Sequence, residues 1–544
     1  MTRPVSQINP TQGLALRFLV PWTTSVLWAS CMLSAVCCFK ANGQTIIENF
    51  AGLNLIKVSM LSGFSTPPDT MGAAGTNHFV EFINGAFGVY DKAGNQLLLE
   101  SDEDFWLNAG IKSGTMSAGL SDPRIFFDVR SGRWFASEIT VDTTGNKVLI
   151  ARSDTSDPTG GWQGTNFIGS TNDFADFDTL GVDALGVYVS ASIFNAAGTS
   201  LLGQSLFCIP KTDLLSAPPS LSRMTRFDNI DDQVYGFTMQ GVCNLDAGAG
   251  HGVAVAIDNA SFGYMDRTTI NNPGAAGATL STPVRITLSY DTQPDNPKQP
   301  NGQTVDVPDD RFADAVWQVG GYIFCANTIA EGGKDVVHWA VLNETNNAVV
   351  GEGYIGDTNY EYFQPAIAVN HAGRIMLVFN RCGTTAPDGY ISICAAVGTL
   401  SNGHVTMGTP FLVKAGTVNY TGLAGVDTTP YRWGDYSATC VDPTDEDLFW
   451  TIQEIPFAAG TWGTQITLLS MATNRPALNI TEMGNTIELS WPLSTDPAYQ
   501  LQFATNLTSG STWNAVTNAP VISINQNVVT LTPAGGAAYF RLAK

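Results

Sequence analysis

A short phrase of residues recurs along this chain and restricts its fold more than any other feature. Each copy has an acidic or amide residue, an alternating apolar run, an Asp or Asn, a turn and a second apolar run. The four clearest copies begin at Asp122, Asp178, Gln364 and Asp435. Each copy predicts two short antiparallel strands joined by a turn. A unit of this kind, repeated every few dozen residues, is typical of a β-propeller, which is a ring of small sheets.

The number of copies sets the expected size of the ring. The anchors of the phrase, including degraded copies, are Asp69, Asp122, Asp178, the strand-like cluster 241–257, Asp314, Gln364 and Asp435. They lie about 50 to 70 residues apart, which suits four-stranded blades with variable loops. We therefore predict an all-β fold with about seven blades over residues 44–475, with six to eight allowed. Residues 45–60 are expected to add a strand to the last blade, so that the ring closes without a long exposed edge.

Residues 1–43 have the features of a signal peptide. Arg3 and Arg17 precede an uncharged apolar stretch over residues 18–39, and Ala41 and Gly43 offer small residues at a cleavage site. The sequence thus predicts an exported chain that is secreted or held at the cell surface. The alternative is an uncleaved membrane anchor, because the apolar stretch is about long enough to span a bilayer.

The composition argues against nucleic acid as a partner. The chain has 48 acidic and 26 basic residues, which gives a formal net charge of −22. Such a surface repels a phosphate backbone. An extracellular glycan or protein is the partner class that remains, and no oligomeric state is indicated.

Six cysteines follow the predicted signal peptide, and an exported chain can oxidise them. Cys382 and Cys394 flank a turn-rich segment, 383–389, between two strand-like runs. We therefore expect a cross-strand disulfide between them. The alternative is that the cysteines are small buried hydrophobic residues.

A second folding unit is expected over residues 476–544. Short strand-like runs with central aromatic residues follow one another there, for example 487–491, 499–503 and 539–542. This pattern predicts a small β-sandwich, which is marginal in size for independent stability.

Residues 66–475 resemble a large set of exported bacterial β-propeller proteins of mostly unassigned function. The phrases that carry the resemblance are 67–73, 121–124, 132–135, 153–162, 178–183 and 432–436. The last seventy residues resemble a small β-domain that ends many exported proteins of verrucomicrobia-like bacteria, through 489–491, 502–507, Trp513, 517–520 and 539–542. Both resemblances imply fold and export rather than a reaction.

One turn gives the resemblance a sialidase-like character. Residues 155–162 resemble the Asp-box of such propellers, although Thr159 stands where Gly is usual. Asp-boxes are structural turns, in which the Asp side chain accepts hydrogen bonds from backbone N–H groups. The turn therefore indicates blades and not activity.

Sialidase chemistry would also need an arginine cluster for the substrate carboxylate, a Tyr nucleophile and an acid. Arg124, Arg311 and Arg432 stand beside the inner-strand phrase in three units, and bidentate capture of a carboxylate by arginine is physically reasonable there. Tyr431 and Asp122 are the nearest candidates for nucleophile and acid. The alternative, which we favour, is that these arginines pair with the recurring acids and hold blade to blade.

General glycoside hydrolysis needs only two carboxylates that face one cleft. Asp122, Asp178 and Asp435 precede presumed inner strands and are expected to gather at one mouth of the ring, together with Asp69 and Asp314. The alternative, again favoured, is that an Asp at this position forms a turn.

Calcium is the one cofactor that the sequence suggests. Asp442, Asp445 and Asp447 lie in an acidic loop of hard oxygen ligands, and the loop 306–310 is similar. Neither loop has the EF-hand spacing, and a solvated acidic turn is the favoured alternative.

Taken together, the sequence favours an exported β-propeller without a complete catalytic set, which binds an extracellular glycan or protein. The alternative is a sialidase-like glycoside hydrolase, or another glycan-active enzyme, with its site at the mouth of the ring.

Overall fold

The computed structural model describes residues 44–471, apart from 249, 259–261, 291 and 308, and six stretches between 478 and 543. The gaps in that last part are 484–485, 494–498, 506–511, 524–525 and 533–537. The predicted signal peptide and the predicted boundary at 475/476 lie outside the described residues. Within the described part, no helix is long and apolar enough to cross a membrane.

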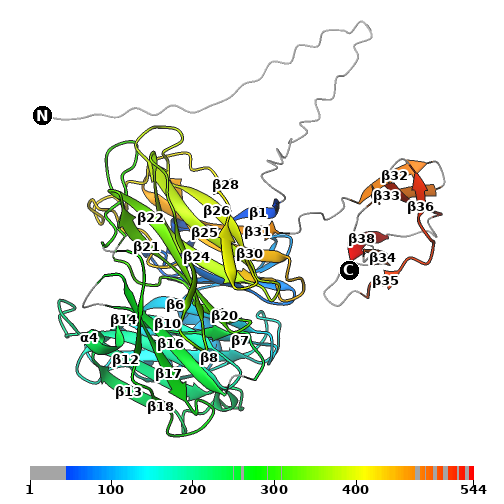
Figure 1. The fold of residues 1–544 in the computed structure, drawn as a ribbon. Coiled ribbons are helices and arrows are strands. Elements are labelled where there is room, and N and C mark those ends of the chain that lie inside the picture. Colours follow the sequence, from blue (N-terminus) through cyan, green and yellow to red (C-terminus); the bar gives the residue numbers. More distant parts are fainter. Residues whose placement is uncertain are drawn as a thin grey trace, which may run out of the picture. The chain divides into compact units, whose positions relative to one another are not determined.

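Seven small, mainly antiparallel sheets between Thr45 and Ser470 form the blades of a propeller (Figure 1). Blade 1 is β2 (Met71–Ala74), β3 (His78–Ile83), β4 (Ala86–Asp91) and β5 (Gln96–Glu100); blade 2 is β6 (Leu120–Asp128), β7 (Arg133–Thr140), β8 (Lys147–Ser153) and β9 (Trp162–Ile168). Blade 3 is β10 (Phe174–Val182), β11 (Gly186–Phe194), β12 (Leu201–Pro210) and β13 (Thr225–Ile230); blade 4 is β14 (Phe237–Gly241), β16 (His251–Ile257), β17 (Tyr264–Asn271), β18 (Thr279–Leu280) and β19 (Val284–Thr287).

The other three blades follow the same plan. Blade 5 is β20 (Trp317–Val319), β21 (Tyr322–Glu331), β22 (Lys334–Asn343) and β23 (Val349–Ile355), with β15 (Cys243–Asn244) added in parallel to β20. Blade 6 is β24 (Tyr360–Val369), β25 (Arg374–Gly383), β26 (Ser392–Ser401), β27 (His404–Met407) and β28 (Phe411–Lys414). Blade 7 is β29 (Ala438–Val441), β30 (Leu448–Ala458), β31 (Thr461–Ser470) and β1 (Thr45–Asn54). The fold class and the expected blade number are thereby confirmed.

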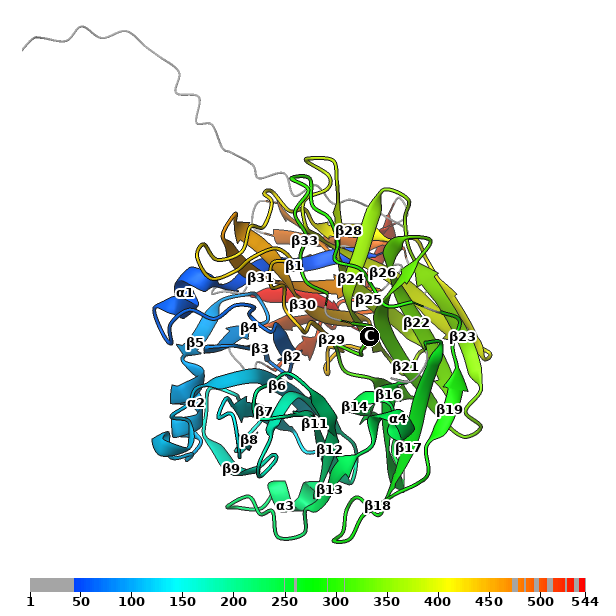
Figure 2. The same cartoon turned by 90° about the vertical axis from the view of Figure 1, so that its left-hand side faces the viewer.

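The first strand of each blade is the innermost one. Figure 2 shows β2, β6, β14 and β29 around the centre of the ring, with β5, β9, β13 and β23 at its periphery. Strand β1 pairs with β31, with Thr45 opposite Ser470. The strand expected from residues 45–60 therefore closes the last blade, as predicted.

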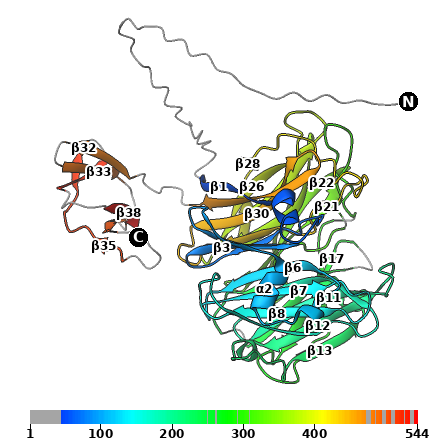
Figure 3. The ribbon, with the colours of Figure 1, turned by 180° about the vertical axis from the view of Figure 1, so that it is seen from behind.

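Short helices fill spaces between the strands: α1 (Leu55–Ser59), α2 (Asp102–Asn108), the 3₁₀ turn η1 (Ser113–Thr115), α3 (Lys211–Leu214) and α4 (Asp232–Tyr235). Helix α2 lies beside blade 2 (Figure 3). Its Phe105 stacks on Phe87 of blade 1 at 4.4 Å between ring centroids and meets Trp162 of blade 2 at 5.0 Å. The helix thus joins two blades through an aromatic core.

The recurring phrase of the sequence corresponds to a β-bulge near the start of the innermost strand. A residue with positive φ stands there in five blades: Asp69 (49°), Asp122 (62°), Phe177 (53°), Thr238 (53°) and Gln364 (49°). In β6, β10, β14 and β24 the strand register shifts at this residue. A bulge bends a strand and redirects its side chains. These four bulges, and the same positive φ at Asp69 just before β2, therefore control what faces the end of the ring where the innermost strands begin.

The predicted disulfide between Cys382 and Cys394 is wrong, because all six cysteines between residues 208 and 440 are free and buried. In the pairing of β25 with β26, Cys394 lies opposite Phe379, which is three residues from Cys382. Side chains an odd number of residues apart on a strand point to opposite faces of the sheet. The two thiols therefore belong to different core clusters, which is the alternative that the sequence left open.

The C-terminal residues form two further small sheets. One has the order β32 (Asn479–Met483), β33 (Thr486–Pro492), β37 (Gln526–Leu531) and β36 (Val521–Ser523); the other has β35 (Asn514–Ala515), β34 (Gln500–Ala504) and β38 (Tyr539–Ala543). Leu489, Trp491 and Val529 of the first sheet share a core with Leu501 of the second. This is the small sandwich that the sequence predicted.

Candidate functional site

Four aspartates from different blades converge at the bulged end of the ring. Asp69, Asp122, Asp176 and Asp435 line one cavity of about 350 Å³, to which we refer as the acidic mouth. They stand at the beginning of the innermost strands of blades 1, 2, 3 and 7. The other lining residues are Thr66, Pro67, Asn84, Ser121, Phe177, Phe194, Arg311 and Arg432.

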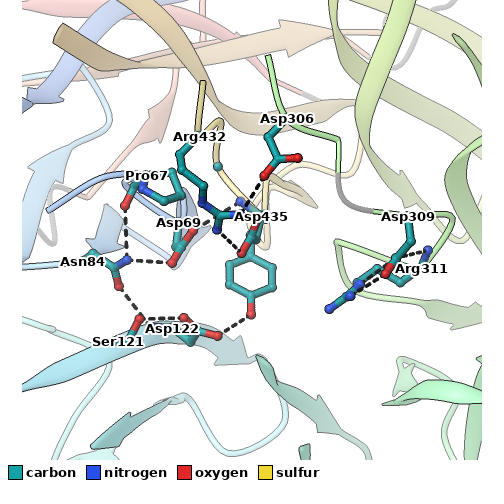
Figure 4. A network of polar contacts seen from close by, with 12 residues as sticks. Pro67, Asp69, Asn84, Ser121, Asp122, Asp306, Asp309, Arg311, Arg432 and Asp435 are labelled. Carbon is teal, nitrogen blue, oxygen red and sulfur yellow. Dashed lines mark hydrogen bonds and ion pairs between the residues drawn. The ribbon is translucent and has the colours of Figure 1, made fainter. Parts of the chain in front are cut away.

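Asn84 ties the first two blades together under this cavity (Figure 4). Its side-chain amide donates to Asp69 Oδ2 at 2.6 Å and to the carbonyl of Pro67 at 3.2 Å. Its Oδ1 accepts from the backbone N–H of Asp122 at 3.0 Å. The residues with positive φ in two blades are thus fixed by one side chain.

Asp122 is held from the opposite side by blade 7. The hydroxyl of the fully buried Tyr436 donates to Asp122 Oδ2 at 2.7 Å, and Ser121 Oγ donates to its Oδ1 at 2.8 Å. Two hydroxyl donors therefore fix this carboxylate while it lines the cavity.

Both arginines of the acidic mouth are engaged in ion pairs. Arg432 contacts Asp306 at 2.8 Å and Asp435 at 2.9 Å. The Nε of Arg311 donates to Asp309 at 2.6 Å, and its Nη2 makes a second contact with the same carboxylate. Each guanidinium is already paired with an acid, and the lining of the mouth has four aspartates but only two arginines. Acidic groups are therefore in excess there.

Burial and crowding change the protonation of these acids. Burial, with the charges of Asp435 and Asp122, raises the pKa of Asp69 well above its usual value. Burial and the charge of Asp122 raise the pKa of Asp176 to about 7. Burial also raises the pKa of Asp435, although Arg432 opposes this effect. Like-charged carboxyls in one site cannot all ionise, so the acidic mouth holds protons at neutral pH.

A second cavity, of about 270 Å³, adjoins the acidic mouth and shares Phe194 and Arg311 with it. Its remaining lining is Leu201, Phe237, Ile257, Asp258, Phe262, Gln293, Asp309 and Asp310. The two cavities together combine charged groups with four phenylalanine side chains, of which Phe194 lies in the shared wall.

The structure does not form the arrangement that the sialidase hypothesis needs. Arg311 and Arg432 line the acidic mouth, but Arg124 does not: its Nε donates to the carbonyl of Asp178 at 2.7 Å. The phenol of Tyr431 accepts from Gln303 at 2.6 Å, and its ring packs in an apolar cluster with Tyr420. Arg124 and Tyr431 therefore do not join Arg311 and Arg432 in the acidic mouth, because both side chains lie in the interior of the ring.

Asp178 is also displaced from the predicted position. It is completely buried and accepts from Ser137 Oγ at 2.7 Å, outside the acidic mouth. The left-handed residue of blade 3 is Phe177 and not Asp178, so Asp176 faces the cavity in its place. Sequence reasoning missed Asp176 because it aligned the two aspartates 122 and 178; alignment of Phe177 with Asp122 would have found it.

The predicted calcium ligands do not come together. Asp442 is bound by Lys92 and by Trp450 Nε1, and Asp447 pairs with Arg374 at 2.7 Å. Asp445 accepts from the backbone N–H of Asp447 at 3.1 Å. Across the residues that the structure describes, no group of three His, Cys, Asp or Glu side chains is placed to hold a metal ion. In the similar loop 306–310, the acids pair with Arg432, Arg311 and Tyr290.

Comparison with known proteins adds little to this geometry. No family model and no curated protein matches the chain. Solved structures that match include a Dyadobacter fermentans protein of unknown function, with 10% identity, 64% of this chain and 93% of that chain covered, and a TM-score of 0.37. The endosialidase of phage phi92 has 9% identity, coverage of 85% and 74%, and a TM-score of 0.38. An α-L-arabinanase of Penicillium chrysogenum has 9% identity, coverage of 78% and 99%, and a TM-score of 0.35. The propeller assignment rests on the sheet topology and not on these similarities.

Proposed function

We propose that the acidic mouth and its adjoining cavity bind an oligosaccharide. The observation that carries this proposal is the mixture of groups around the shared wall of Phe194 and Arg311. Carboxylates accept hydrogen bonds from sugar hydroxyls, while Asn84 and the arginines are donors. Phenylalanine faces pack against the apolar faces of sugar rings. Two adjoining cavities suit a chain of sugars better than they suit a single sugar.

The charge of the site selects among glycans. Four aspartates line the acidic mouth against two arginines, and both arginines are paired with acids. A carboxylate-bearing sugar would find both guanidinium groups already paired and would add a further carboxyl beside crowded carboxyls, so the site favours neutral or amino-bearing glycans. The predicted signal peptide supports an extracellular location for such a ligand, in keeping with secretion or display at the cell surface.

The test is binding of the purified chain to an array of neutral, amino-bearing and acidic glycans, followed by calorimetry with the best ligand. We expect Asp176→Asn to weaken binding at least tenfold. Asp388→Asn, which changes an exposed aspartate outside both cavities, is the matched control and should bind as the wild type does. An array without any signal would contradict a glycan ligand and leave an extracellular protein as the ligand to be sought. A preference for sialylated or uronic glycans would contradict the charge argument.

A glycoside hydrolase is the second candidate, and one observation favours it. Burial holds the pKa of Asp176 at about 7, in the same cavity as Asp122, which has two hydroxyl donors. A protonated acid and a hydrogen-bonded carboxylate in one cleft are the groups that hydrolysis of a glycosidic bond requires. Such a reaction would use two carboxyl groups, without the arginine cluster and Tyr nucleophile of sialidases.

Release of reducing ends from the glycan that binds best would distinguish the two candidates. If the site is catalytic, Asp176→Asn and Asp122→Asn should each lower the rate by about 10²-fold or more, because each removes one half of the acid–base pair. Asp388→Asn should leave the rate unchanged. Binding without any release of reducing ends would rule out hydrolysis of that glycan.

A further inference from the structure

A third cavity lies along the axis of the ring and has a different chemistry. It has a volume of about 220 Å³ and takes residues from the innermost strand of every blade. Its walls are largely apolar, with Met71, Phe126, Leu180, Trp317, Val369 and Ala438 from six of the seven blades. It shares no lining residue with the acidic mouth. We refer to it as the axial cavity.

Arg124 and Tyr436 separate the axial cavity from the acidic mouth. The hydroxyl of Tyr436 donates to Asp122 of the acidic mouth, while the guanidinium of Arg124 lies 3.6 Å from the centroid of the Tyr436 ring and lines the axial cavity. The polar rim at the other end includes Arg130, Asn370, His371 and Glu446. Access to the axial cavity is therefore expected from the end of the ring where the innermost strands finish.

Arg124 is a buried cation with unused hydrogen-bonding capacity. Arg124 is only 4% exposed, and its Nη2 has no hydrogen-bond partner. Among the residues that the structure describes, no carboxylate lies within ion-pair distance of it. Burial raises the pKa of the nearby Asp314 well above its usual value, which favours the neutral form of that acid. A buried cation left without a counter-charge is costly, and an anion in the cavity would offset that cost.

A second unused donor lies in the same wall. Trp317 is 6% exposed, and its indole Nε1 is buried without a partner. Most buried polar groups in folded proteins are satisfied. A guanidinium with an unpartnered Nη2 and an indole N–H without a partner lie together in a largely apolar cavity that Asp314 also lines. This is the pattern of a binding site in which a few polar groups orient an apolar ligand.

We propose that the axial cavity binds a small amphiphile, an unbranched alkyl carboxylate, with its carboxylate at the guanidinium of Arg124 and its chain along the apolar walls. The apolar walls remove the chain from water, and the charge-assisted hydrogen bond to Arg124 fixes the direction of the molecule. This site is independent of the glycan site, since the two share no residue.

The experiment uses octanoate as the probe and octanol as its uncharged counterpart, with the full chain in calorimetry. The fluorescence of Trp317 is a second signal. We expect one octanoate to bind per chain, at least tenfold more tightly than octanol, because only octanoate can pair with Arg124. Equal affinities for the two probes, or no binding of octanoate, would overturn the proposal.

Variants then locate the bound molecule. Arg124→Gln should abolish the preference for octanoate over octanol, whereas Arg374→Gln, a surface arginine paired with Asp447, should keep it. Ala438→Phe places a large ring in the axial cavity and should abolish binding of both probes. Octanoate binding that survives Ala438→Phe in a folded chain would place the ligand elsewhere and overturn the proposal. If Arg124→Gln or Ala438→Phe fails to fold, Ala73→Val narrows the same cavity with a smaller change and must weaken octanoate binding severalfold; unchanged binding would overturn the proposal.

Discussion

At the scale of the residue, burial controls the aspartates near the ring axis. Asp178 has no exposed surface, and burial, opposed in part by Arg124, raises its pKa to about 8. Asp176 is half-buried and lines the acidic mouth, and its pKa is raised to about 7 for the same principal reason. A carboxyl in such a place is more stable with its proton than without it. Asp176 and Asp178 therefore keep their protons at a pH at which an aspartate in the unfolded chain has lost its own.

Raised pKa values make the stability of the protein depend on pH with a definite sign. The pKa of an aspartate in the unfolded chain is about 3.9, so between pH 4 and pH 8 the folded chain holds more protons at Asp178 than the unfolded chain does. The free energy of unfolding should therefore fall as pH rises through this window. Asp178→Asn should flatten the decline by up to about 1.4 kcal/mol per pH unit.

Urea denaturation between pH 5 and pH 8 would measure this slope. Asp388→Asn, in an exposed loop, is the control and should keep the slope of the wild type. A wild-type slope in Asp178→Asn would mean that this carboxyl is ionised in the folded protein.

At the scale of the element, the bulges of the innermost strands repeat one backbone conformation with unrelated side chains. Gln364 uses its side chain, since its amide donates to the carbonyl of Gly434 and joins blade 6 to blade 7. Thr238 has the same positive φ, but its hydroxyl is buried and lacks a partner. A branched residue is the least suited to this conformation.

Thr238 and Gln364 should therefore respond in opposite ways to replacement by glycine. Thr238→Gly removes the steric cost of the left-handed conformation and an unpartnered hydroxyl, and we expect a gain of about 1 kcal/mol in stability. Gln364→Gly relieves the same backbone but loses the contact between two blades, and we expect a loss of about 1 kcal/mol or more. Chemical denaturation of both variants measures the difference. If the free energy of unfolding changed in the same direction in both variants, the two side chains would not differ in their contribution to the contact between blades.

A buried ion pair joins blades 2 and 3 at the opposite end of the ring. Lys211 Nζ lies 2.9 Å from Asp128 and also donates to the carbonyl of Asp183, and both charged side chains are almost completely buried. Lys211→Met should lower the free energy of unfolding by about 3–5 kcal/mol, because it leaves the Asp128 carboxylate without its cation. The double variant Lys211→Met/Asp128→Asn should recover part of this loss in thermal denaturation. If the double variant is less stable than Lys211→Met, the cost does not come from the unpaired charge.

At the scale of the whole molecule, the ring was predictable because its signal is repeated and local. Period-two alternation identifies strands, and the spacing of the phrase identifies blades. Functional positions depend instead on registers that differ by one residue. The shift at Phe177 exchanges Asp176 for Asp178, and an odd spacing separates Cys382 from Cys394. Pairing of arginines with acids was predictable in kind, and Arg432 does contact Asp435, but the contact of Arg432 with the distant Asp306 depends on the fold.

The net charge of −22 affects the molecule as a whole. Repulsion among the acids destabilises a compact state, and salt screens it. We expect the melting temperature to rise by a few degrees between 10 mM and 300 mM sodium chloride, measured by differential scanning fluorimetry. A fall in melting temperature over this range would show that the ion pairs between blades outweigh the general repulsion.

The pairing of Thr45 with Ser470 has a consequence for the order of the chain. These residues begin the first strand and finish the last strand of one antiparallel pair, so a tight hairpin could join them. The ring should then fold from a circularly permuted sequence that starts in another blade. A circular permutant joined across this pair and opened in the turn after Asn343 should keep all seven sheets, with the closing seam moved to blade 5.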